Sequence, residues 1–415
     1  MSPRFPGNNP SIRAALAAAV LGLVFMLGYQ TSAAAQSADP PTREEELARQ
    51  QRAKAKAVHP YTPGFVERQL LEIEDTGGFA VVRPIGVAFG DIKPGSGIAF
   101  GPETGRTFAN GAVVLAKAEY SINNFKLGQV FFQSAPIAEG RLMINGRVRW
   151  QDAPKVAMYG VGPNAPSARA NYSEQKTEIS AQAFVHPVSF VRLAAGTAYE
   201  KFLTNGGAVD LGEERPLPVV PTVPGLNADP GYLHSYGSAA LDSRETPGYS
   251  RSGTLLQAVL HDYRDQDRGQ YSFRQVNGIA QQLVPILHGN VVLDLSARAW
   301  TTGTTGDDIV PFFVMPSLGG SNFLRGFPQY RFRDRHALLL TGQYKWYVQE
   351  YLDAVLFYEA GKVAARTKDL DLNNLEKAYG FGVHVHTPGA TLLRLEVAHS
   401  RETTRFIIGF APDIF

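Results

Sequence analysis

Hydrophobic and polar residues alternate along most of this chain, from about Gly95 to its end. In the tract from Arg141 to Trp150, apolar side chains occupy every second position, and arginine and asparagine fill most of the positions between them. Further tracts with this period are 112–120, 291–300, 338–348 and 392–398. A period of two gives a β-strand one apolar and one polar face, so the sequence predicts an all-β protein.

A soluble sandwich of two sheets would show the same alternation, but three features favour a membrane barrel. The polar face repeatedly carries charged residues, which a wet lumen accommodates. The tracts run for roughly ten residues, the length of a tilted transmembrane strand. Aromatic residues lie near tract ends, where they would form an interfacial girdle: Tyr120, Trp150, Trp346 and Tyr347. Counting back from Phe415 predicts a transmembrane antiparallel β-barrel of about sixteen strands over 79–415.

The N-terminal part of the chain has a different pattern, which predicts export. A basic start, an apolar run over 14–27 and the small residues Ala33-Ala34-Ala35 are typical of a signal peptide, expected over 1–35. The polar segment 36–78 then predicts a short periplasmic segment, either a plug at the periplasmic mouth or a tether. The Pro- and Gly-rich stretch over 203–232 predicts a long extracellular loop.

Composition narrows the possible functions. The formal net charge is +2, which gives no reason to expect nucleic-acid binding. There are 0 cysteines, which excludes disulfides and thiolate metal sites.

One stretch, Leu318–Phe327, is basic, flanked by glycines and placed between two alternating tracts. Such a loop suits a position folded back into a polar lumen, where Arg325 would meet an acid. On a later strand, Phe357, Glu359 and Gly361 share one face. If that face lines the lumen, the Glu359 carboxylate can hold the Arg325 guanidinium bidentately. We therefore expect this ion pair to hold the loop inside the barrel.

The same residues resemble the BamA/TamA superfamily of outer-membrane assembly factors (the bacterial surface antigen barrel domain), to which two-partner-secretion transporters belong. Leu324-Arg325-Gly326-Phe327 is similar to the (V/L)RG(F/Y) signature of its inward-folded loop, and Phe357-x-Glu359-x-Gly361 to its F-x-D-x-G strand. Tyr379-Gly380-Phe381-Gly382 and Leu393–Val397 resemble its last strands. Phe415 resembles the C-terminal signal by which outer-membrane barrels are recognised for insertion.

This resemblance implies a role in inserting or translocating proteins (or lipids) at the outer membrane of a Gram-negative-type bacterium. It also implies a seam between the first and last strands, and we expect Gly95–Gly101 to lie in the first strand. Two features depart from the family. Glu359 replaces the usual Asp, and the segment 36–78 is too short for POTRA repeats, the periplasmic modules that receive clients.

Other polar clusters favour simpler interpretations. Arg331, Arg333 and Arg335 could bind lipopolysaccharide phosphates but fit a lumenal charge network better. His384 and His386 share a strand face without an identifiable third ligand, so we expect no metal and no cofactor. His399-Ser400 lacks a G-x-S-x-G elbow, so we expect no enzymatic activity.

Two alternatives to insertion or translocation remain open. A lumen lined by Arg147, Arg149, Lys345 and Arg394 could conduct small anions as a channel. The barrel could also be structural and work with a separate periplasmic partner. In each case the expected partners include outer-membrane lipids and lipopolysaccharide, with unfolded outer-membrane proteins as possible clients.

Overall fold

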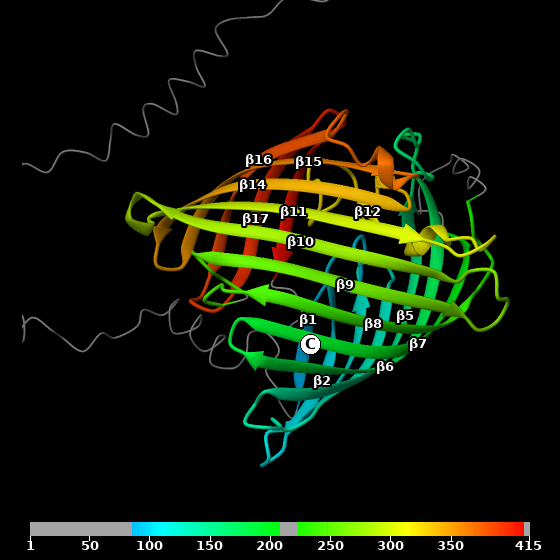
Figure 1. Cartoon of the computed structure of the whole chain (residues 1–415), viewed down its shortest axis with the longest axis horizontal. Helices are drawn as coiled ribbons and strands as arrows, with labels where there is room; N and C mark the ends of the chain where they lie inside the picture. Colours follow the sequence, from blue (N-terminus) through cyan, green and yellow to red (C-terminus); the bar gives the residue numbers. More distant parts are fainter. Residues whose placement is uncertain (1–84, 208–222, 247, 411–415) are drawn as a thin grey trace, which may run out of the picture. The chain divides into compact units, whose positions relative to one another are not determined.

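The structure is a computed structural model that describes residues 85–207, 223–246 and 248–410. Sixteen strands form one antiparallel sheet in chain order, and Figure 1 shows the sheet curling around a lumen. The first eight strands are β1 (Gly86–Gly90), β2 (Ala99–Thr107), β3 (Val113–Ser121), β4 (Lys126–Gln133), β5 (Leu142–Met158), β6 (Ala170–Val188), β7 (Val191–Gly206) and β8 (Gly231–Asp242). The other eight are β9 (Gly253–Asp265), β10 (Phe273–Ile286), β11 (Val291–Gly303), β14 (His336–Gln349), β15 (Leu352–Ala364), β16 (Glu376–His386), β17 (Thr391–Ser400) and β18 (Thr404–Phe410). The predicted barrel of about sixteen antiparallel strands is confirmed.

The sixteen-strand count places the start of β1 and the end of β18 at the same end of the barrel, here called the terminal end. The opposite end is called the loop end. It carries the connections between β7 and β8 and between β11 and β14. The connection between β8 and β9, residues 243–252, lies at the terminal end. Three short 3-10 helices complete the described structure: η1 (Leu287–Gly289), η2 (Phe312–Val314) and η3 (Thr367–Asp369). Within the described residues, no helix is both long and apolar enough to cross a membrane.

Burial in the wall is the reverse of burial in a soluble protein. Large apolar side chains point outward, such as Val148 at 50% and Leu356 at 59% exposure. Their polar neighbours point inward and are covered, such as Glu178 at 6% and Glu359 at 1%. Soluble proteins rarely expose continuous apolar surface, whereas a lipid-facing wall must. The alternation in the sequence therefore places the apolar face outside and the polar face inside.

Two sequence predictions are wrong. The first strand is β1 (Gly86–Gly90), and the stretch 95–101 forms a turn and the start of β2. Gly95 and Gly97 have φ angles of +100° and +68°, which suit a turn and not a strand. Tyr347 faces the lumen, since its neighbour Trp346 is on the outer face at 49% exposure. Trp150 is exposed on the outer face, and its strand β5 extends beyond the predicted tract to Met158.

Some predictions fall on parts of the chain that the structure does not describe. These are the signal peptide at 1–35, the periplasmic segment at 36–78, residues 208–222 of the Pro-rich stretch and Phe415. The predicted long loop is present, since β7 ends at Gly206 and β8 begins at Gly231.

Candidate functional site: the lumen loop and its anchors

Residues 304–335, here called the lumen loop, connect β11 to β14. The loop contains a small hairpin of β12 (Ser317–Leu318) and β13 (Phe332–Arg333), and Figure 1 shows β12 close to the strands of the wall. Four of its apolar side chains are almost fully covered: Leu318, Leu324 and Phe327 at 0% exposure and Phe332 at 2%. They pack against inward residues of β14, β15 and β16, among them Leu339, Val363 and Ala378. The loop thus has its own apolar core against the inside of the wall.

The backbone of the loop is shaped by its glycines. Gly319 and Gly320 have φ angles of +105° and +119°, in the region that glycine adopts without strain. A Cβ at Gly319 would also lie 2.2 Å from the carbonyl oxygen of Pro328. Leu324 adopts a φ of +52°, which is uncommon for a residue with a side chain. This conformation places Leu324 in the apolar cluster and turns Arg325 towards the wall.

Arg325 is anchored to Glu359 of β15 through two hydrogen bonds. Its backbone N–H donates to Glu359 Oε2 at 2.6 Å, and its side-chain Nε donates to Oε1 at 3.0 Å. The residues are 2% and 1% exposed, so water screens this ion pair little. The structure thus brings together the two residues that the sequence paired. The bidentate grip involves one backbone and one side-chain donor of the arginine.

A second carboxylate, which the sequence analysis did not pair, completes the site. Arg325 Nη1 donates to Glu396 Oε1 of β17 at 2.7 Å, and the same oxygen lies 2.8 Å from His384 Nε2 of β16. Arg325 therefore connects β15 to β17 across β16. Removing a single carboxylate would leave the guanidinium attached to the wall through the other.

The Phe357 ring of β15 forms the floor under the guanidinium. The centre of the Arg325 guanidinium lies 3.5 Å from the ring centroid, a close cation–π contact. Gly380 on β16 leaves room for this ring, because a Cβ there would lie 2.4 Å from Phe357 Cζ. Gly361 likewise leaves room for Leu318, whose Cδ1 would lie 3.0 Å from an added Cβ. Both glycines belong to the motifs that resemble the family, and their lack of a side chain leaves room for the residues that contact the lumen loop.

The loop also contacts the last two strands. The Ser400 hydroxyl of β17 donates to the Gly326 carbonyl oxygen at 2.7 Å. Arg405 of β18 donates to the carbonyl oxygens of Arg325 at 3.2 Å and Phe327 at 2.7 Å. A Cβ on Gly326 would lie 2.6 Å from the His399 carbonyl oxygen, so only glycine fits this approach without movement. The tip of the loop is thus bonded to β15, β17 and β18.

The other part of the loop bonds both to the turn between β17 and β18 and to the connection between β5 and β6. Arg331 forms an ion pair with Glu402 at 2.8 Å and donates to the Ala165 carbonyl oxygen at 3.0 Å. Arg333 forms a backbone bridge with Gly162, in the connection between β5 and β6. Arg331 and Arg333 are 4% and 3% exposed, so the lumenal arrangement describes them better than a surface anion site. The lumen loop therefore spans the lumen from one half of the barrel to the other.

The two edges of the sheet are short. β1 has 5 residues and β18 has 7 described residues. Within the described part of the chain, β1 pairs with β2 alone and β18 with β17 alone. The C-terminal edge is supported from inside by the lumen loop through Arg405.

The remaining candidates take separate roles. His384 bonds to Glu396, whereas His386 lies near Asp353 and stacks on Tyr249, so the two histidines do not converge on one site. No group of three or more potential ligands in the described residues could hold a metal ion. His399 Nδ1 is bonded to Thr404, and Ser400 to the lumen loop.

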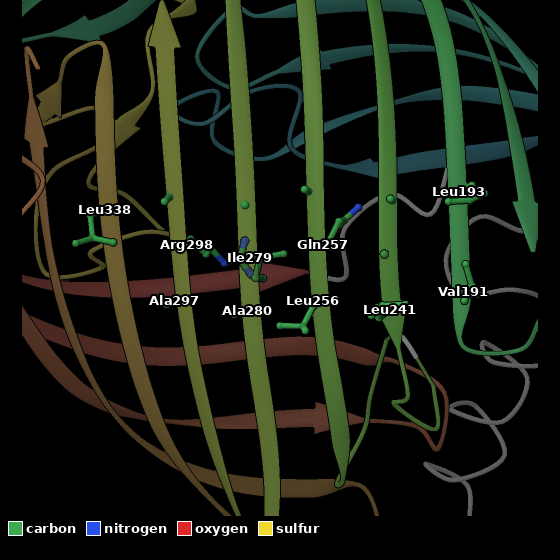
Figure 2. Close-up of a pocket in the computed structure, with 15 residues that line it drawn as sticks. Val191, Leu193, Leu241, Leu256, Gln257, Ile279, Ala280, Ala297, Arg298 and Leu338 are labelled. Atoms are coloured by element: carbon green, nitrogen blue, oxygen red, sulfur yellow. The ribbon is translucent and has the colours of Figure 1, made fainter. Parts of the chain in front are cut away.

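A hollow on the outer wall is separate from the Arg325 site in the lumen. Figure 2 shows residues that line it, on β7 to β11 and β14. Its volume is about 510 Å³. Its outward residues are aliphatic or small, including Leu193, Leu241, Leu256 and Leu338. The Arg298 guanidinium packs 5.6 Å from the Phe323 ring of the lumen loop, so that charge belongs to the lumen. The hollow is part of the lipid-facing surface.

The fold is similar to that of solved outer-membrane barrels. BamA from Haemophilus ducreyi lacking POTRA domains 1–3 matches with a TM-score of 0.57 and 12% identity, over 83% of this chain and 76% of that one. CdiB from Escherichia coli gives a TM-score of 0.49 at 11% identity, over 84% and 67% of the two chains. CdiB from Acinetobacter baumannii gives 0.46 at 9%, over 79% and 56%. No protein-family model and no curated protein matches the chain. In its fold, the chain is a transmembrane β-barrel of the BamA type.

Proposed function

We propose that this barrel assists the insertion or translocation of proteins at the outer membrane of a Gram-negative-type bacterium, without making or breaking covalent bonds. The observation that carries the proposal is the asymmetric support of the seam. The lumen loop holds the C-terminal strands through Glu359, Glu396 and Arg405. The N-terminal edge is the five-residue strand β1, which can separate at low cost.

The mechanism follows from this asymmetry. A strand edge with unpaired N–H and C=O groups is a template for pairing with another strand. Because the lumen loop fixes β15, β17 and β18 relative to one another, β18 would stay in register while β1 moves away. An incoming client strand would then pair with β18, and its apolar side chains would enter lipid directly.

A stable ion channel fits the lumen less well. The lumen loop fills the loop end with covered apolar side chains, including Phe312 and Phe327 at 0% exposure. The four cations expected to line an anion path all have partners: Arg147 with Glu178, Arg149 with Gln151, Lys345 with Asp294 and Arg394 with Asn322. The carboxylates of Glu178 and Asp294 neutralise the first and third of these cations and reduce their attraction for mobile anions. Arg149 and Arg394 bond to neutral amide oxygens and keep their charge. A structural barrel that works with a periplasmic partner would not need an open lumen, so the position of the lumen loop does not count against that alternative.

The decisive experiment measures the folding rate of a client barrel in the presence of this protein, with its β1–β18 seam either free or closed by a disulfide. The refolded protein is reconstituted into liposomes, and the insertion of an unfolded eight-stranded barrel is timed by its heat-modifiable migration. The chain has 0 cysteines, so a disulfide between one cysteine in β1 and one in β18 is the only one present. We expect acceleration that this staple abolishes and reduction restores.

The matched control is a staple inside the C-terminal wall. Leu395 and Ile408 are paired on β17 and β18, so a disulfide there leaves the seam free. This control should keep the acceleration. If neither the unstapled protein nor the control speeds insertion, the insertase function is wrong, and single-channel conductance then decides between a channel and a partner-dependent barrel.

A further inference from the structure

The ten-residue connection between β8 and β9 does not remain at the rim of the barrel. Its described residues, 243–246 and 248–252, are here called the strap. Gly248 forms a parallel backbone bridge with Ala390, in the turn between β16 and β17. Four wall strands, β10, β11, β14 and β15, lie between β9 and that turn. The strap therefore connects two distant parts of the wall at the terminal end of the barrel.

The strap carries an aromatic residue, Tyr249, that packs among inward-facing residues of the wall. The Tyr249 ring stacks on the His386 ring with a centroid distance of 3.8 Å and an interplanar angle of 9°. The Tyr249 hydroxyl donates to Asp353 Oδ2 at 3.0 Å. His386 and Asp353 are 2% and 3% exposed, so this contact is buried inside the barrel. This contact thus lies at the starts of β15 and β17 and the end of β16.

Backbone contacts make the seat specific. The Thr391 N–H donates to the Gly248 carbonyl oxygen at 3.2 Å. A Cβ on Gly248 would lie 2.4 Å from the Gly389 carbonyl oxygen and 3.1 Å from Ala390 Cα, so only glycine fits. Further along, the Arg251 guanidinium lies 4.5 Å from the ring centroid of Tyr347 on β14. The strap is held by hydrogen bonds, ring stacking and a cation–π contact together.

We propose that the strap is a latch at the terminal end, which ties β15–β17 to the β8–β9 wall and must detach before the lumen opens at that end. The lumen loop holds the same strands at the opposite end through Glu359, Glu396 and Ser400. The two contacts act in series along the lumen, so releasing either one alone leaves the path closed. This latch concerns the lumen itself and holds whether or not the protein inserts clients.

The experiment uses Gly248→Ala, which forces the strap away from the turn, and the milder Tyr249→Phe, which removes only the bond to Asp353. Gly237→Ala on β8 is the matched control, because no atom lies within 4 Å of the added Cβ. Hydrogen exchange in detergent reports on the Thr391 amide, whose acceptor is Gly248 of the strap. We expect its exchange to rise about tenfold in Gly248→Ala and less in Tyr249→Phe, as loss of hydrogen bonds predicts.

Single-channel recording in planar bilayers tests the series arrangement. The Arg325→Ala Gly248→Ala double variant should spend at least about tenfold longer in open levels than either single variant. The Arg325→Ala Gly237→Ala double variant should behave like Arg325→Ala alone. The latch is overturned if Thr391 exchanges in Gly248→Ala as it does in Gly237→Ala, or if the two double variants conduct equally.

Discussion

Arg325 donates from both its backbone and its side chain to the one carboxylate of Glu359, at 2.6 and 3.0 Å, while its Nη1 reaches Glu396 at 2.7 Å. The arginine thereby joins the lumen loop to two strands of the wall. Because the loop backbone itself takes part, the position of the loop and the position of the side chain are fixed together. A lysine could not reproduce this arrangement, since it lacks the planar fork of donors.

The first prediction is energetic coupling between these two residues. Arg325→Ala should destabilise the barrel by roughly 1.5–3 kcal/mol, the usual contribution of a hydrogen bond to a charged group, plus the cost of leaving Glu359 buried without its partner. The Arg325→Ala Glu359→Ala double variant should lose less than the sum of the single variants. Urea unfolding in detergent, followed by tryptophan fluorescence, measures all three. Simple additivity would show that the two residues do not interact.

The second prediction concerns the length of the acid. Glu359→Asp retains the charge but shortens the side chain by one methylene, so the carboxylate can no longer reach both Arg325 donors without movement. We expect faster proteolysis of the lumen loop and a lower unfolding midpoint. Glu376→Asp is the control, because Glu376 pairs with Arg401, whose side chain is 60% exposed, and such pairs contribute little. Equal effects of the two substitutions would contradict the prediction.

The third prediction tests the close approach of the loop to β17. In Gly326→Ala the new Cβ would lie 2.6 Å from the His399 carbonyl oxygen and 2.9 Å from Ser400 Cβ. The loop must therefore move from the wall and weaken the bond from Ser400. Hydrogen exchange of the loop should rise, and the unfolding midpoint should fall. Gly303→Ala on β11 has no atom within 4 Å of its Cβ and should leave both measurements unchanged.

The sequence predicts the wall well because lipid on one side and water on the other impose a strict period of two. The Arg325–Glu359 pair can be predicted for the same reason, since the period of two places Glu359 on the lumen face of its strand. The same period places Glu396 on that face of β17. It was not paired with Arg325 because the register that brings β15 and β17 to one guanidinium lies in three dimensions.

Other features left no such pattern. The strand β1 is Gly-Val-Ala-Phe-Gly, with no charged inner position to contrast with its apolar outer face. The predicted tract ends at Trp150, whereas β5 continues to Met158. Pro154 and the register shift between Ala153 and Val156 interrupt the alternation in this part of the strand. The strap contacts residues more than a hundred positions away, as in the bond from Tyr249 to Asp353. No local periodicity encodes such contacts, and only the folded wall brings them together.

The last prediction concerns pH and a carboxyl group in the lumen loop. Asp334 is 3% exposed, and burial raises its pKa above the usual range, although the Arg335 N–H donates to it at 2.7 Å. A raised pKa means that its favourable contribution is present below about pH 3.9, the ordinary value for Asp, and is lost as pH rises through the folded pKa. Asp334→Asn should therefore raise the melting temperature at pH 7, and the gain should disappear towards pH 3. Asp369→Asn is the control with the opposite sign, since its ion pair with Arg366 lowers the pKa of Asp369. A lower melting temperature for Asp334→Asn at pH 7 would mean that the bond from Arg335 outweighs the cost of burying the charge.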